Sequence, residues 1–197
     1  MNFKLNYPKI CLIIFIIVFI FGAINPISRS DWLLESLLSV LLVIILTLTY
    51  KKYKISTTSY TLITIFLVIH TIGSHYTYSN VPFLNFLWEM TNSTRNHYDR
   101  IVHFLFGFLL YFPIRELIVR KTNLKGFFSY FLPFCAVATA SLSYELLEWA
   151  ATLIFNPELG AEYLGIQGDI WDAQKDSLLA ISGAILSILV NLFKKKS

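Results

Sequence analysis

Four short clusters of acidic and histidine residues interrupt an otherwise apolar chain of 197 residues. Carboxylates and imidazoles are the usual ligands of Mg, Mn, Zn and non-haem Fe, and they also carry most general acid–base steps. Because each cluster lies at one end of an apolar segment, the pattern predicts one composite site. The clusters are GSHYTY at 73–78, RNHYDRIVHF at 95–104, SYELLEWA at 143–150 and GDIWDAQKD at 168–176.

The residue types in these clusters suggest separate roles. Glu148 is the candidate general base, and Arg100 is the candidate phosphate clamp, because its planar guanidinium matches phosphate oxygens. The chain has no HExxH or comparable metal motif. The first hypothesis is a metal-dependent hydrolase acting on the phosphate or headgroup of a lipid-linked substrate at the outer leaflet. The candidate ligands of its divalent metal (Zn, Mg, Mn or Fe) are His75, Asp99, His103, Glu145, Asp172 and Asp176.

Two other functions fit the same residues. Polar residues inside membrane bundles often pair for structure, and Arg100 and Lys175 could neutralise neighbouring acids in a buried network. An ion- or proton-coupled transporter is the third hypothesis. Transporter sites usually lie near the midplane of the membrane, between internal repeats. This chain has no visible repeat, and its acids fall near the ends of the apolar segments, which disfavours a transporter.

The composition indicates that the elements positioning these residues are membrane helices. The chain is 56% hydrophobic and 14% charged, with mean hydropathy +0.63, values outside the range of soluble domains. A membrane helix needs about 20 mostly apolar residues. The sequence predicts an all-α polytopic protein, a bundle of six transmembrane helices forming one domain over 1–197. The predicted helices lie near 8–24, 32–50, 58–78, 100–119, 127–155 and 174–193.

The distribution of charge predicts the orientation, because cytoplasmic loops carry excess Lys and Arg. Twelve of the sixteen basic residues fall on one side of the predicted helices, and every acid except Glu116 falls on the other. Both termini are therefore expected on the cytoplasmic side of the membrane, with the first helix retained rather than cleaved as a signal peptide. Since topology explains the basic pI, membrane lipids are the expected partners, and nucleic acid is not.

Helical periodicity predicts which helices meet at the site. A rise of about 1.5 Å per residue brings His75, Glu145 and Asp176 to nearly the same depth, about 26 Å from the basic side. Asp99, His103 and Gly107 share one face of their helix, and small residues follow Asp176. The third to sixth helices are therefore expected to form the core bundle, flanked by the first two. His70 and His97 are expected on the same side but outside the pocket.

The motifs GSHYTY, NHYDRIVHF, YELLEWA and GIQGDIWDAQKD together resemble the YjdF-like family of bacterial inner-membrane proteins over most of the chain. This resemblance implies a multi-pass inner-membrane protein and no particular activity. A more distant likeness, carried by Asp99-Arg100, His103-Phe104, Glu145 and the acids before Gly183, is to the VanZ-like membrane proteins. The chain departs from that pattern at Glu148, where an amide is expected, and in lacking an arginine before the last acids.

Overall fold

The computed structural model describes residues 6–82, 95–155 and 167–196, and within these ranges the chain folds into six helices. Each predicted segment coincides with one helix, with ends displaced by a few residues. The all-helical fold class is thereby confirmed for the described residues. The helices are α1 (Tyr7–Gly22), α2 (Arg29–Thr49), α3 (Thr57–His75), α5 (Tyr98–Thr122), α6 (Phe128–Phe155) and α8 (Asp172–Lys196).

Side-chain caps set the beginnings of the first three helices. Asn6, Ser28 and Ser56 each adopt an extended backbone, and each side-chain oxygen accepts a hydrogen bond from the backbone N–H three residues ahead. Such caps satisfy backbone donors that the first helical turn leaves unpaired. At the other end of α5, Asn123 adopts a left-handed conformation (φ 54°), which ends that helix.

Pro113 and Pro133 lie in helix interiors and do not end those helices. Because proline can kink or end a helix, the sequence leaves both outcomes open at Pro113. α5 continues through Pro113 to Thr122, which agrees with the predicted helix over 100–119. α6 likewise continues through Pro133. Neighbouring helices can accommodate a proline in a membrane helix, and both side chains are buried here.

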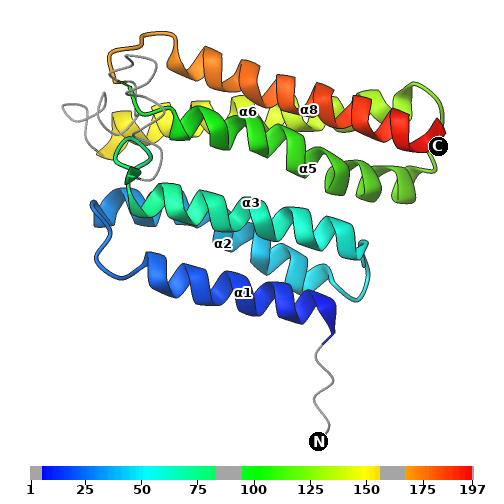
Figure 1. The fold of residues 1–197 in the computed structure, drawn as a ribbon, viewed down its shortest axis with the longest axis horizontal. Coiled ribbons are helices and arrows are strands. Elements are labelled where there is room, and N and C mark those ends of the chain that lie inside the picture. Colours follow the sequence, from blue (N-terminus) through cyan, green and yellow to red (C-terminus); the bar gives the residue numbers. More distant parts are fainter. Residues whose placement is uncertain (1–5, 83–94, 156–166, 197) are drawn as a thin grey trace, which may run out of the picture.

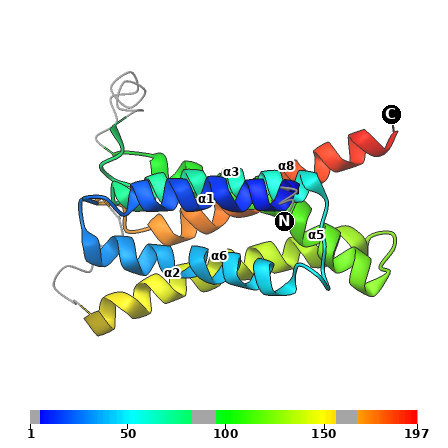
Figure 2. The ribbon, with the colours of Figure 1, turned by 90° about the horizontal axis from the view of Figure 1, so that it is seen from below.

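Successive helices run in alternating directions along the long axis of the molecule (Figure 1). α1, α2 and α3 lie on one side of the bundle and α5, α6 and α8 on the other, and Figure 2 shows the same bundle turned by 90°. α3 and α5 join the two groups. α2, α5 and α8 begin at one end of the bundle, which we call the acidic end. The opposite end, where α1, α3 and α6 begin, we call the basic end.

The charges of the described residues separate between these two ends, as the sequence predicts. Lys51, Lys52 and Lys54 follow α2, and Arg120 and Lys121 lie in the last turn of α5, all at the basic end. Glu116 is the acid placed there, where it pairs with Arg120 at 2.7 Å. Of the remaining acids, Glu89, Glu158 and Glu162 lie outside the described residues.

α5 and α8 make the most extensive helix contact, and two glycines allow it. A Cβ built on Gly107 would overlap the backbone carbonyl of Ala180, and one on Gly183 would overlap that of Phe104. Two helices can approach this closely only where side chains are absent. The predicted stripe of small residues is thus the contact surface between these helices, and it holds their first turns together at the acidic end.

The outer faces of the bundle carry large apolar side chains. Five helices in the described part are long and apolar enough to cross a membrane, while α1 is apolar but has only 16 residues. Ile17, Leu37, Leu48, Leu146 and Leu189 are among the many exposed apolar residues. A soluble protein rarely exposes contiguous apolar surface of this kind, so these faces are suited to contact with lipid.

Candidate functional site

Three helices begin at the acidic end, and their N-termini favour carboxylates there. Asp31, Asp99 and Asp172 lie in the first turns of α2, α5 and α8. The N-terminus of a helix carries a partial positive charge and unpaired N–H groups, which stabilise a nearby anion. This local effect helps to explain how so many acids are held at one end of an apolar bundle.

Ion pairs form the outer layer of the acidic end. Arg95 donates to Asp172 at 2.6 Å, and both side chains are almost fully buried. Arg100 donates to Asp169 and also reaches Asp172 at 3.5 Å. Lys175 donates to Asp169 at 2.6 Å. We call these five residues the ion-pair layer.

A second group of acids lies further into the bundle around His103, and we call Asp99, His103, Glu145 and Asp176 the inner cluster. The His103 Nε2 atom lies 3.5 Å from Asp99 Oδ1 and 3.5 Å from Glu145 Oε1. One ligand atom from each of Asp99, His103 and Asp176 falls within 4.8 Å of the other two. Three helices, α5, α6 and α8, supply these four side chains.

Two oxygens of the inner cluster are buried without a hydrogen-bond partner among the described residues. They are Glu145 Oε1 and Asp176 Oδ1. Asp176 is only 2% exposed, so bulk water does not solvate it. Buried polar atoms in native structures nearly always have a partner, and a cation or an ordered water between these groups would supply one.

Glu35 of α2 forms a hydrogen-bonded group beside the inner cluster. The Tyr144 hydroxyl donates to Glu35 Oε2, and the Tyr78 hydroxyl lies 3.4 Å from the same oxygen. Tyr78 also contacts His70 Nδ1 at 2.6 Å, and His70 Nε2 lies 3.1 Å from the backbone carbonyl of Glu35. Glu148 lies within electrostatic range of Glu35 and Glu145. We call Glu35, His70, Tyr78 and Tyr144 the tyrosine network.

The partners of His70 define its tautomer. A carbonyl oxygen can only accept, so Nε2 carries the proton and donates to Glu35. In a neutral ring Nδ1 must then accept, and Tyr78 is the donor. The single hydroxyl proton of Tyr78 is therefore committed to His70. The contact of Tyr78 with Glu35 is a hydrogen bond only when the carboxyl group carries a proton of its own.

A cavity of about 330 Å³ opens between α2, α3, α5 and α6 next to these groups. Asp99, His103, His70, Tyr78 and Tyr144 line its polar part. Ser39, Ser141 and Ser143 also line the cavity, and the remaining wall is apolar. A ligand with a polar head and a hydrocarbon tail would match this division. The apolar wall is formed by Leu38, Leu42, Phe66, Leu67, Val102, Phe106, Leu110 and Leu147, with Ala140.

The structure brings some of the predicted site residues together and places others elsewhere. Asp99, His103, Glu145 and Asp176 converge. Asp172 and Arg100 lie instead in the ion-pair layer, outside the inner cluster. His75 turns away, since its Nδ1 lies 2.9 Å from the carbonyl of Gly22 at the end of α1. The roles assigned to all of these residues stay predictions.

α2 packs on α3 at the flank of the bundle, but the sequence prediction missed that it places Glu35 beside Tyr78 and Tyr144. His70, expected outside the pocket, lines the cavity. A signal for Glu35 is present in the sequence: it is an acid inside an apolar run, where a charge costs about 2.5–3.5 kcal/mol at the membrane centre. An acid at such a position is retained only where side chains of neighbouring helices provide it with polar partners.

The described fold is that of a polytopic helical membrane protein with a buried cluster of acids and histidines at one end. The chain belongs to the family described as "Predicted membrane protein (DUF2238)", which matches residues 7–197. It is 34% identical over 175 residues to "Inner membrane protein YjdF" of Escherichia coli (strain K12), covering 88% of this chain and 83% of that protein. No solved structure matches the chain.

The family match confirms the resemblance to YjdF-like proteins carried by the four motifs. Together with the apolar helices, it identifies the chain as a multi-pass protein of the inner membrane. The names of the family and of the relative state where these proteins reside, and they do not state a reaction.

Proposed function

We propose that this protein is a metal-dependent membrane enzyme that acts on the phosphate or headgroup of a lipid. The observation that carries the proposal is the convergence of Asp99, His103 and Asp176 beside a largely apolar cavity. A hard divalent cation accepts carboxylate and imidazole ligands together. The cavity next to it supplies space for hydrocarbon, so headgroup and tail would each have a matching environment.

The charge balance of the acidic end supports a cation in the inner cluster. Within the described residues, the ion pairs of Arg95, Arg100 and Lys175 are with Asp169 and Asp172. No ion pair with Lys or Arg is found there for Glu35, Asp99, Glu145, Glu148 or Asp176. Several ionised carboxylates cannot share a buried site without compensation. They need bound protons, a metal ion or both.

The residues around the cluster have separate tasks in this proposal. Asp99, His103 and Asp176 would hold the cation, and Glu145 would complete the set through its unpartnered oxygen. When bound, a divalent cation polarises a phosphoryl oxygen and lowers the pKa of water. Glu148 accepts a proton as the general base. Arg100 would meet a phosphate only by sharing its guanidinium with Asp169 and Asp172, which already hold it.

Element analysis of the purified protein tests the proposal. The wild type is expected to carry a divalent metal in stoichiometric amount, and His103→Ala and Asp176→Ala are expected to lose it. His75→Ala is the matched control, because this histidine lies at the same end but contacts Gly22 instead of the cluster. Metal-free wild type, or equal metal content in His75→Ala and His103→Ala, would refute the metal site.

A purely structural polar network is the first alternative, and the ion-pair layer favours it for the outer acids. If the inner cluster has the same role, His103→Ala and Asp176→Ala should lower the midpoint of thermal unfolding (Tm) equally with and without a chelator. A metal site predicts instead that the chelator lowers the Tm of the wild type and leaves that of the two variants unchanged.

A proton-coupled carrier is the second alternative, and the tyrosine network favours it. Tyr144, Tyr78 and His70 line the cavity, and Glu35 contacts both tyrosines, so the four groups form a continuous hydrogen-bonded chain when Glu35 carries a proton. Such chains conduct protons in membrane proteins. Reconstituted protein that moves protons or an ion down an imposed gradient, and loses this activity in Glu35→Gln, would establish a carrier in place of an enzyme.

We further propose that all six helices cross the membrane, with both termini in the cytoplasm. α1 spans about 24 Å at 1.5 Å per residue, which is short of the hydrocarbon thickness of about 30 Å. It nevertheless lies beside α3 along its length (Figures 1 and 2). The excess of Lys and Arg at the basic end supports a cytoplasmic location for that end.

A further inference from the structure

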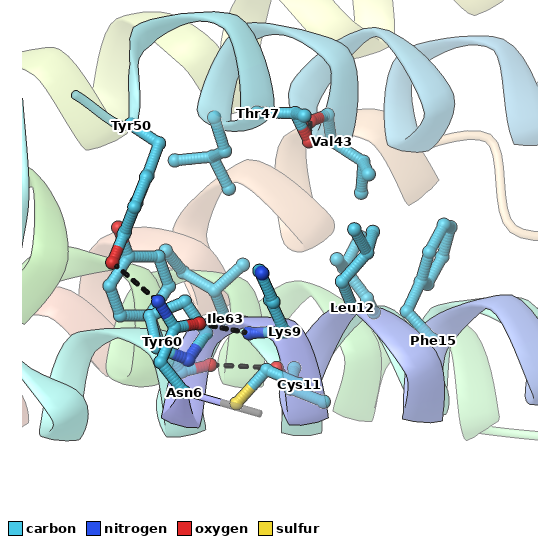
Figure 3. A pocket seen from close by; sticks show the side chains of 14 residues that line it. Asn6, Lys9, Cys11, Leu12, Phe15, Val43, Thr47, Tyr50, Tyr60 and Ile63 are labelled. Carbon is cyan, nitrogen blue, oxygen red and sulfur yellow. Dashed lines mark hydrogen bonds between the residues drawn. The ribbon is translucent and has the colours of Figure 1, made fainter. Parts of the chain in front are cut away.

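A second cavity lies at the basic end, between α1 and α2, and is separate from the proposed active site. Its volume is about 220 Å³, and its floor is formed by α3. α1 and α2 both pack on α3 and make few contacts with each other, so a slot remains between them. Figure 3 shows Leu12 and Phe15 of α1 directed into this slot from one side and Val43 and Thr47 of α2 from the other.

The slot is polar at its rim and apolar in its depth. Asn6, Lys9 and Tyr50 line the rim, and Asn6 Nδ2 donates to the Tyr50 hydroxyl at 3.1 Å across the mouth (Figure 3). The buried side chains of Phe15 and Leu67 line the deeper part. Phe15 lies six residues beyond Lys9 along α1, which corresponds to about 9 Å.

Positive charge lies at the rim and in the segment that follows it. The Lys9 side chain is directed into the slot in Figure 3, and Lys51 and Lys52 are exposed directly after α2. Among the described residues that line the slot there is no acid. The rim therefore presents Lys9 and hydrogen-bond donors, with Lys51 and Lys52 close by in sequence. It lies at the level of the membrane surface, because α1 begins and α2 ends there.

We infer that this slot binds an anionic phospholipid of the leaflet at the basic end, with its phosphate at Lys9 and one acyl chain between α1 and α2. The protein resides in the inner membrane, so hydrocarbon surrounds the open side of the slot. Charge complementarity selects the headgroup, since Lys9, Lys51 and Lys52 attract a phosphate that carries net negative charge. A second copy of this chain would bring the same cations to the rim. Repulsion between the two sets of lysines disfavours a dimer at this surface.

Thermal unfolding of the detergent-purified full chain with added lipid tests the inference. Phosphatidylglycerol is expected to raise the Tm of the wild type by about 5 °C or more at saturation. Phosphatidylcholine with the same acyl chains should raise it clearly less. Lys9→Gln should lose the difference between the two lipids. Lys125→Gln, a change of the same kind in the exposed loop before α6, should keep it.

A second pair of variants tests the slot itself. Thr47→Trp places a large side chain at the wall of the slot, and Thr47 is exposed, so the fold should tolerate it. This variant is expected to lose the stabilisation by phosphatidylglycerol. Leu48→Trp is the control, because Leu48 is 79% exposed and does not line the slot. It should respond as the wild type does.

Four results would overturn the inference. Three of them are equal stabilisation of the wild type by both lipids, an unchanged lipid preference in Lys9→Gln, and loss of the response in Leu48→Trp as well as in Thr47→Trp. A dimer that Thr47→Trp converts to a monomer in light scattering would assign the slot to a contact between two copies instead. None of these measurements depends on metal at the acidic end.

Discussion

At the scale of single residues, the acidic end contains two kinds of carboxylate. Asp169 and Asp172 have cationic partners, and their charges are compensated within the fold. Asp99, Glu145 and Asp176 share one histidine, and two of their oxygens lack a hydrogen-bond partner in the described part of the chain. Substitutions in the first group should therefore act on stability, and those in the second on ligand binding.

Arg95→Met is expected to lower the free energy of unfolding by about 3–5 kcal/mol, because it leaves the buried carboxylate of Asp172 without its closest cation. Denaturation in detergent micelles measures the change. Lys175→Gln is the control in the same layer. Its side chain is 49% exposed, so the loss should stay below about 1 kcal/mol. Equal effects of the two substitutions would contradict the buried character of the Arg95 pair.

The pH dependence of stability should report on Asp169. The hydrogen bond from Lys175 is the main reason that the pKa of this carboxyl lies at about 2, below its ordinary value of 3.8. A carboxyl whose pKa is lower in the folded than in the unfolded chain stabilises the folded state at pH values above the pKa of the unfolded chain. That stabilisation is lost as the pH falls from about 4 to about 2. Asp169→Asn should remove this part of the acid dependence. The measurement compares the Tm of both proteins across that window, and identical slopes would contradict the pairing.

At the scale of helices, the α5–α8 contact determines the geometry of the inner cluster. Asp99 and His103 lie on α5 and Asp176 on α8, so the distance between these helices controls whether the three ligand atoms converge. Gly107 and Gly183 permit that distance. The helix N-termini at the acidic end contribute a second effect, since they favour the carboxylates that start α2, α5 and α8.

Gly107→Ala is expected to destabilise the protein by about 1–3 kcal/mol, because the added Cβ would overlap the backbone carbonyl of Ala180. In an ordinary helix the same change stabilises by about 0.5–1 kcal/mol, so the sign of the effect is the test. Unfolding in micelles gives the free energy. Metal content measured on the same sample should fall as well if the proposed site depends on close approach of α5 and α8. A stabilised variant would show that the helices are further apart than described.

At the scale of the whole molecule, the alternating helices and the separated charges define two chemically different ends. The basic end has Lys and Arg after α2 and along the end of α5, and the acidic end has the carboxylates of the described residues other than Glu116. With an even number of crossings both termini lie on the same side. The lipid proposed at the basic end and the substrate proposed at the acidic end would then belong to opposite leaflets.

Reporter fusions test this orientation. Green fluorescent protein fused after Ser197 should fluoresce, and alkaline phosphatase at the same position should be inactive, because the fused domain stays in the cytoplasm. As a control, alkaline phosphatase inserted between Asn25 and Pro26, in the segment between α1 and α2, should be active. Active phosphatase at Ser197 would reverse the orientation and move the inner cluster to the cytoplasmic side.

The sequence by itself determined the helical class, the six segments, the separation of charge and the family. These follow from local properties, since apolar length and the positions of Lys and Arg do not depend on what packs against what. It also determined that Asp99 and His103 share a face with Gly107, because helical periodicity fixes neighbours along one helix.

Only the tertiary structure decided which of the clustered residues face one another. Arg95 and Arg100 neutralise Asp169 and Asp172, which separates Asp172 from the ligands predicted beside it. His75 lies at the acidic end, but its ring turns toward α1. Depth and periodicity give the height and the face of a residue on its own helix. The rotation and spacing of one helix against another depend on side-chain packing. That packing brings Glu35 to Tyr78 and Tyr144, which line the cavity, and leaves the slot at Lys9 open.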